Sequence, residues 1–303
     1  MDIVVIAYRA RLIFVMAICS DARRLRTSLL DLGADMDSQT LTSITTGDGI
    51  RIAYRFDGRQ GKPVLLLSNS IGTDLHMWDG QLVALTEHFR LLRYDARGHG
   101  ASDVPSGPYS LDRLGRDVVE LLDALGLRRV HVLGLSLGGV VAQWLGIHVP
   151  ERVDRLVLSN TAAYLGPARQ WDRPIAEVLE APDMRATAEM FLRNWFPARM
   201  LEDNDEVVEG FRRTLLATRR EGVAGSWAAV RDYDLRRTAT LIRNPTLVIA
   251  GEHDTVTSAS HGKEIASTIR GARFTVLPTV HMANVERPAE FVDAVVAFLT
   301  ERS

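Results

Sequence analysis

Residues 130–139 read Val130-His131-Val132-Leu133-Gly134-Leu135-Ser136-Leu137-Gly138-Gly139, an apolar, β-branched run that passes into Gly-Leu-Ser-Leu-Gly. An apolar pattern typical of a helix follows as far as Ile147. The stretch predicts a strand, a tight turn with Ser136 at its apex, and a helix. Glycines two residues before and after the serine keep Cβ atoms out of such a crowded turn. The helix after Ser136 directs unpaired N–H groups at charge developing beside the hydroxyl, as a serine nucleophile requires.

The composition is that of an ordinary globular protein with no cofactor signature. Of the 303 residues 46% are hydrophobic, and the formal net charge of −2 gives no general attraction to nucleic acid or anionic membranes. Lys62 and Lys263 are the only lysines, which disfavours a Schiff-base mechanism. The single cysteine, Cys19, excludes an intrachain disulfide and a thiolate metal cluster. We expect no cofactor, no metal ion and no nucleic-acid partner, and a cytoplasmic location; the oligomeric state stays open.

The N-terminal residues differ from the rest of the chain. Residues 12–19 are apolar but fewer than the roughly 20 residues that a membrane span needs. Bulky Ile18 makes this segment a poor signal-peptide cleavage site, although a signal peptide remains the alternative. We interpret residues 1–36 as an upstream extension of the reading frame, with Met36 as a candidate true start, and expect no stable membrane association.

Strand and helix patterns alternate along most of the remaining sequence. This alternation predicts an α/β fold with a mostly parallel sheet of about eight strands and helices on both faces. The strand signal disappears over residues 164–238, which have helical patterns. We interpret this stretch as a helical cap inserted into a core of residues 37–163 and 239–303. The cap should lie over the carboxyl edge of the sheet, where open α/β sheets bind ligands.

A catalytic triad is expected at this edge. A serine nucleophile needs a base to accept its proton and a carboxylate to orient that base. The predicted strand at 246–251 is followed by Asp254, our candidate carboxylate, with Glu252 in reserve. The last predicted strand is followed by a loop containing His281, the candidate base. We therefore predict the triad Ser136, Asp254 and His281.

Acyl transfer also requires donors for the oxyanion, each worth roughly 3 kcal/mol of barrier. We predict the first to be the backbone N–H of Leu137, directly after the nucleophile. The second should come from the loop after the predicted strand at 63–69, and we assign it to the N–H of Ile71.

At this point the sequence resembles the α/β-hydrolase family, from about Ser43 to the C-terminus. Four stretches resemble the 3-oxoadipate enol-lactonases of the β-ketoadipate pathway. The first has Asn-Ser where His-Gly is common in the superfamily, and the third lies in the predicted cap. The stretches are Leu67-Ser68-Asn69-Ser70-Ile71-Gly72-Thr73-Asp74-Leu75-His76-Met77-Trp78, Asn160-Thr161-Ala162-Ala163, Gly225-Ser226-Trp227-Ala228-Ala229-Val230-Arg231-Asp232-Tyr233-Asp234-Leu235-Arg236 and His281-Met282-Ala283-Asn284-Val285-Glu286-Arg287-Pro288.

The resemblance implies hydrolysis of a small acidic lactone by water, giving an open 3-oxo diacid. The substrate's carboxylate should then meet a cation or several donors. Arg231 in the cap is our candidate and Arg193 a weaker one; a structural ion pair of Arg231 with Asp232 or Asp234 is the alternative.

Three further residues are expected to contact substrate. Ser70 lies in the loop that should form the oxyanion hole, and Trp195 and Trp227 lie in the cap. The tryptophans would form the wall of the cleft and exclude water, with core packing as the alternative role.

Other functions share this fold and triad, so only the pocket distinguishes them. The nearest alternatives are a carboxylesterase, a perhydrolase or a carbon–carbon bond hydrolase. A non-catalytic small-molecule receptor is an alternative of a different class.

Overall fold

The structure is a computed structural model that describes residues 41–203 and 205–301, and their strands form one eight-stranded sheet. The spatial order is β1-β2-β4-β3-β5-β6-β7-β8. The pairs β1–β2 and β2–β4 are antiparallel and the other neighbouring strands are parallel, which confirms the predicted sheet. The strands are β1 (Thr42–Thr45), β2 (Arg51–Asp57), β3 (Val64–Ser68), β4 (Arg90–Tyr94), β5 (Val130–Leu135), β6 (Val153–Ser159), β7 (Thr246–Gly251) and β8 (Arg273–Leu277).

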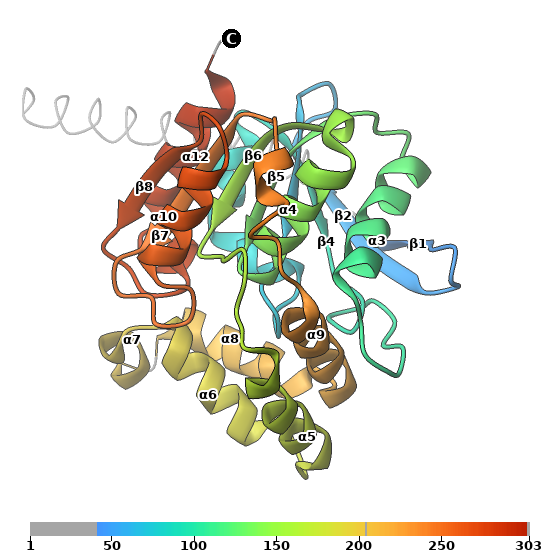
Figure 1. The fold of residues 1–303 in the computed structure, drawn as a ribbon, viewed down its shortest axis with the longest axis vertical. Helices are drawn as coiled ribbons and strands as arrows, with labels where there is room; N and C mark the ends of the chain where they lie inside the picture. Colours follow the sequence, from blue (N-terminus) through green and yellow to red (C-terminus); the bar gives the residue numbers. More distant parts are fainter. Residues whose placement is uncertain (1–40, 204, 302–303) are drawn as a thin grey trace, which may run out of the picture. The chain divides into compact units, whose positions relative to one another are not determined.

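Helices cover both faces of the sheet (Figure 1). On one face α3 packs against α4, and α4 and α10 both pack against η4; on the other, α12 packs against η1 and α2. These helices and the short turns that join them are η1 (Leu75–Gln81), α2 (Leu82–Thr86), α3 (Leu111–Ala124), α4 (Leu137–His148), η2 (Pro150–Arg152), η4 (Ala239–Leu241), α10 (Ala259–Thr268), α11 (Ala283–Glu286) and α12 (Pro288–Thr300). No helix in the described ranges is long and apolar enough to span a membrane.

The remaining helices lie between β6 and β7, within the stretch predicted to be a cap. In Figure 1 they gather together below the ends of the strands, from yellow-green α5 to brown α9. They are η3 (Ala168–Gln170), α5 (Asp172–Glu180), α6 (Arg185–Trp195), α7 (Ala198–Glu202), α8 (Glu206–Ala217) and α9 (Arg220–Asp232). We call residues 164–238 the cap. The extension predicted at residues 1–36 lies outside the described residues.

The central strands are buried because both of their faces pack against helices. All six residues of β5 and of β7 are buried, whereas β1 and β8 at the sheet edges are largely exposed. Near the carboxyl ends of the central strands, Ser68 is paired with Gly134, and Leu135 with Ser159. This register brings the loops that follow β3, β5 and β6 to the same edge of the sheet.

Candidate active site

Ser136 occupies the turn between β5 and α4 in a strained backbone conformation. Its φ of 57° and ψ of −120° lie outside the regions that L-residues ordinarily occupy. The backbone N–H of Ser136 donates to the carbonyl of Ser159 at 3.0 Å, and the Thr161 hydroxyl donates to the carbonyl of Ser136 at 2.8 Å. Contacts from the neighbouring strand and its loop therefore fix the turn.

The two glycines beside this turn are required by close backbone approach. A Cβ on Gly134 would collide with the carbonyl of Gly138, and a Cβ on Gly138 would collide with the carbonyl of Ser68. The strand, turn and helix predicted from the sequence are all present. Any side chain at either position would push α4 away from the sheet and displace Ser136.

Asp254 and His281 come together from the loops after β7 and β8. Nδ1 of His281 lies 2.8 Å from Oδ2 of Asp254, and both side chains are almost completely buried. A proton on Nδ1 donated to Asp254 leaves the lone pair of Nε2 free to act as a base. Ser136 and His281 line the same cavity. The three predicted residues are thus at one site.

Three residues that the sequence analysis did not assign also bond to Asp254. Oδ2 also accepts hydrogen bonds from Nδ2 of Asn160 at 3.0 Å and from the hydroxyl of Thr257 at 2.9 Å. Oδ1 accepts from the backbone N–H groups of Val256 at 2.8 Å and Thr257 at 3.0 Å. Asn160 directly follows β6 and adopts a φ of 44°, and in this conformation its side chain bonds to Asp254. The sequence signals at Asn160 were its place directly after a central strand and its position in one of the four stretches that resemble the enol-lactonases.

The charge of Asp254 is stabilised by these contacts. Burial alone would raise its pKa, but the opposing charge and hydrogen bond of His281, with the bonds from Asn160 and Thr257, lower the pKa to about 2. Asp254 is therefore a carboxylate throughout the neutral range. Glu252, the reserve candidate, has a side chain that is 60% exposed and lies beside His253. It is a solvated loop residue in this structure.

The two predicted oxyanion donors lie at the same cavity. Leu137 is the first residue of α4, and Ile71 lies in the loop after β3. Both residues line the cavity with Ser136. Within the described residues neither backbone N–H has a hydrogen-bond acceptor, which leaves both available for an oxyanion.

The cavity is small and mostly apolar. Its volume is about 190 Å³, below the range of drug-sized pockets, and therefore suits a compact substrate. Trp227 and Trp195 both line it and both contact Phe191, with ring centroids 5.7 and 4.9 Å apart. The lining residues are Ser70, Ile71, Ser136, Leu137, Val140, Thr161, Ala162, Leu165, Trp171, Pro174, Met190, Phe191, Asn194, Trp195, Trp227, Val230, Tyr233, Val256, Thr257 and His281.

Arg231 does not line this cavity, contrary to the role predicted for it. Its guanidinium donates to Asp232 at 2.7 Å and to Asp172 at 3.3 Å, near the C-terminus of α9. These two carboxylates hold the guanidinium outside the cavity, and the alternative ion pair with Asp232 is the one found. Arg193 is also absent from the lining and is exposed. Of the residues described, no Lys or Arg contributes to the cavity wall.

The neutral donors of the cavity are therefore the groups available to a substrate carboxylate. Ser70 lines it as predicted and is 4% exposed. Asn194, on α6 of the cap, was not identified from the sequence; its Nδ2 lies 3.2 Å from Sδ of Met190, a weak acceptor. A cap asparagine beside a predicted pocket tryptophan carries no distinctive sequence signal.

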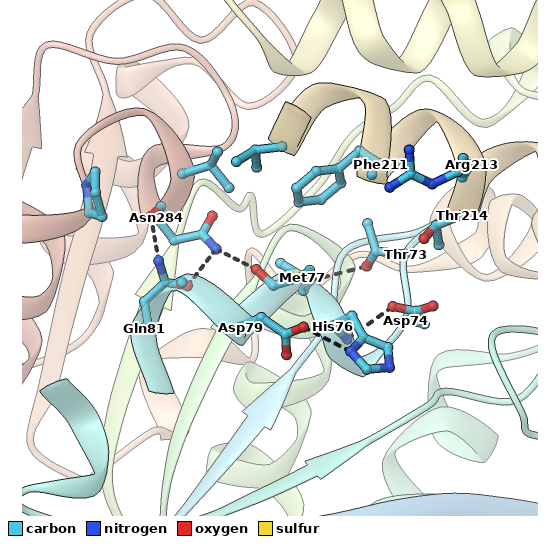
Figure 2. A pocket seen from close by; sticks show the side chains of 15 residues that line it. Thr73, Asp74, His76, Met77, Asp79, Gln81, Phe211, Arg213, Thr214 and Asn284 are labelled. Carbon is cyan, nitrogen blue, oxygen red and sulfur yellow. Dashed lines mark hydrogen bonds and ion pairs between the residues drawn. The ribbon is translucent and has the colours of Figure 1, made fainter. Parts of the chain in front are cut away.

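A second, larger cavity of about 520 Å³ lies between η1, α11 and α8 and contains none of the triad (Figure 2). Figure 2 shows Phe211, Arg213 and Thr214 across this space from Thr73 and Asp74. His76 and Asp79 at its rim bond to each other at 2.9 Å. In the part of the chain that the structure describes, no cluster of His, Cys, Asp or Glu is arranged to bind a metal ion.

A family model described as the alpha/beta hydrolase fold matches residues 63–288. The chain belongs to the α/β-hydrolase family. It is 37% identical over 254 residues to 3-oxoadipate enol-lactonase 2 of Acinetobacter baylyi, covering 84% of this chain and 95% of that protein.

Solved structures agree with this membership. The enol-lactonase from Burkholderia xenovorans LB400 is 39% identical with a TM-score of 0.83, covering 86% of this chain and 100% of that one. A hydrolase from Pseudomonas aeruginosa PA01 is 62% identical with a TM-score of 0.86, covering 86% of this chain and 99% of that one. The resemblance to the enol-lactonases is confirmed, and the chain is a hydrolase.

Proposed function

We propose that this hydrolase opens 3-oxoadipate enol-lactone to 3-oxoadipate through an acyl-enzyme on Ser136. The observation that carries the proposal is that His281, which is bonded to Asp254, lines one small cavity together with Ser136. The similarity to proteins named enol-lactonase supports the choice of substrate. This assignment places the enzyme in aromatic catabolism by the β-ketoadipate pathway, in the cytoplasm.

In the first half of the reaction, Oγ of Ser136 attacks the lactone carbonyl while Nε2 of His281 accepts the hydroxyl proton. The tetrahedral oxyanion accepts hydrogen bonds from the N–H groups of Leu137 and Ile71. Collapse of the intermediate breaks the bond between the carbonyl carbon and the ring oxygen. The leaving enolate takes the proton from His281 at carbon and becomes the 3-oxo group.

In the second half, water displaces Ser136 from the acyl group, which still carries the new 3-oxo group because opening the ring releases no fragment. His281 removes a proton from this water, whose oxygen attacks the acyl carbon on Ser136. The second tetrahedral intermediate collapses, Oγ takes the proton back from His281, and the free diacid leaves. Asp254 stays ionised in both halves and stabilises the imidazolium that forms each time.

The test of this function is loss of the ultraviolet absorbance of the enol-lactone when enzyme is added. We expect rapid turnover of the lactone, and slower turnover of simple aryl esters. Efficient hydrolysis of aryl esters without lactone activity would instead indicate a carboxylesterase. Perhydrolase or carbon–carbon bond hydrolase activity in place of lactone turnover would also refute the proposal, as would ligand binding without turnover, which a receptor would show.

The absence of a cation from the described cavity wall leads to a prediction about Asn194. We propose that its amide N–H and the Ser70 hydroxyl bind the substrate carboxylate. A hydrogen bond to a charged group contributes about 1.5–3 kcal/mol, so Asn194→Leu should raise KM for the acidic lactone at least about 10-fold. KM for a neutral aryl ester of similar size should change much less.

Arg231→Ala is the matched control for this prediction, because it removes a cap cation that does not line the cavity. We expect it to leave KM for both substrates nearly unchanged. If Arg231→Ala raised KM for the lactone alone while Asn194→Leu did not, the carboxylate would be bound by the arginine, and the proposed role of Asn194 would be wrong.

A further inference from the structure

The loop that carries His281, residues 278–282 between β8 and α11, contacts the cap directly after the histidine and is linked to it through Glu286 before the histidine. The backbone N–H of Met282, directly after His281, donates to the carbonyl of Trp195 at the end of α6, at 3.2 Å. The backbone N–H of Val280, directly before it, donates to Oε2 of Glu286 at 2.8 Å. The other oxygen of Glu286 accepts from Nη2 of Arg199, on cap helix α7, at 2.6 Å.

Glu286 lies on an element that is itself fixed to the core. On α11, Nδ2 of Asn284 donates to the backbone carbonyl of Met77 at 3.1 Å. The backbone carbonyl of Asn284 accepts from Nε2 of Gln81 at 2.7 Å, and both bonds are drawn in Figure 2. The side chain of Glu286 is only 3% exposed, whereas that of Arg199 is 60% exposed. A buried carboxylate on a fixed platform thus binds the loop with one oxygen and a cap cation with the other.

We propose that Arg199 and Glu286 are positioning residues that couple the cap to the catalytic histidine. The bond from Val280 to a carboxylate is charge-assisted and therefore short and directional. Arg199 fixes the rotamer of that carboxylate, so that Oε2 points at Val280. Removing either partner lets the loop shift, and a displacement of the base by less than 1 Å is enough to weaken proton transfer from Ser136.

The cap therefore has a role besides forming the pocket wall. It contacts the His281 loop directly from α6 and, through Glu286, from α7. Leu215 of α8 lies against Gly72 in the oxyanion loop, where an added Cβ would meet it at 2.7 Å. A correctly seated cap is a condition for alignment of the base. This inference rests on the proposed catalytic role of His281, but not on the identity of the lactone.

The experiment measures two rates in Arg199→Ala, Glu286→Gln and the double variant: phosphonylation by a fluorophosphonate, and kcat for a neutral aryl ester. Each single variant should lower both rates about 10-fold while KM stays within about 2-fold. The double variant should be no slower than the slower single variant, because both changes break the same link. Arg199→Lys should restore most of the rate, since one N–H suffices.

Arg185→Ala is the matched control, because Arg185 is an exposed α6 arginine whose partner, Asp183, is also in the cap. It should leave both rates unchanged, and thermal unfolding should show that every variant is still folded at the assay temperature. Rates in Arg199→Ala equal to wild type, or a loss in Arg185→Ala of the same size, would overturn the coupling. His281→Gln, measured in parallel, separates the two proposals: if it stays active, the function proposed for His281 fails first.

Discussion

Ser136→Ala should lower kcat for the lactone by about 10⁵-fold or more, because it removes the hydroxyl proposed to form the acyl-enzyme. The residual rate would come from the oxyanion donors and from binding alone. The substitution keeps a Cβ at the same strained φ of 57°, so it neither relieves nor adds backbone strain. The N–H bond to Ser159 and the bond from Thr161 to the carbonyl of Ser136 both involve the backbone and remain.

The measurement combines steady-state turnover with mass spectrometry after exposure to a fluorophosphonate. Wild-type enzyme should gain one phosphonyl group on Ser136, and Ser136→Ala should gain none while unfolding at the wild-type midpoint. Ser70→Ala removes the other serine of the described cavity wall and should still be labelled. Lactone hydrolysis by Ser136→Ala within about 100-fold of wild type would rule out a serine acyl-enzyme at this position.

The sequence predicted the sheet and the meeting of three catalytic candidates for one physical reason. Parallel strands buried on both faces read as apolar runs, as in β5 and β7, and their carboxyl ends share one edge. Residues directly after such strands can therefore be predicted from the sequence to lie close together in the fold. Asp254 and His281 follow β7 and β8 and lie 2.8 Å apart in the structure.

The residues of the cap that line the cavity were less predictable, because no rule like the shared edge of parallel strands says which side of a cap helix meets the site. Arg231 follows pocket residue Val230 in the sequence, yet successive helix positions point about 100° apart, and its guanidinium reaches Asp172 and Asp232. Asn194 lines the cavity from α6, and its Nδ2 donates to Sδ of Met190. Which face of a cap helix meets the core depends on tertiary packing, so periodicity alone did not identify either outcome.

Asp254→Asn should lower kcat by about 10⁴-fold through the tautomer of His281. Oδ2 accepts from His281, Asn160 and Thr257, and Oδ1 accepts from two backbone N–H groups. An asparagine must direct its NH₂ at one of these sets of donors. With NH₂ toward His281, Nδ1 becomes the acceptor, the proton moves to Nε2, and the lone pair that would accept the proton of Ser136 is lost.

Asp254→Asn should also change how the free energy of unfolding depends on pH. The folded-state pKa of Asp254, about 2, lies below the ordinary value of an aspartate, about 3.9, so the ionised carboxylate stabilises the fold above about pH 4. That contribution, about 2 kcal/mol, is lost as pH falls from 4 towards 2. Urea unfolding should show that wild type loses about this much more stability than Asp254→Asn over the interval, since the other carboxylates titrate in both proteins.

Glu252→Gln is the matched control, since Glu252 is the nearby acid on the same loop and is solvated. We expect it to keep full activity and the wild-type dependence of stability on pH. Because Asp254 is ionised above about pH 4, an acid limb of kcat/KM at higher pH must arise from another group. Loss of activity in Glu252→Gln with retention in Asp254→Asn would transfer the carboxylate role to Glu252, and ¹⁵N spectra showing His281 unchanged in Asp254→Asn would exclude the tautomer argument.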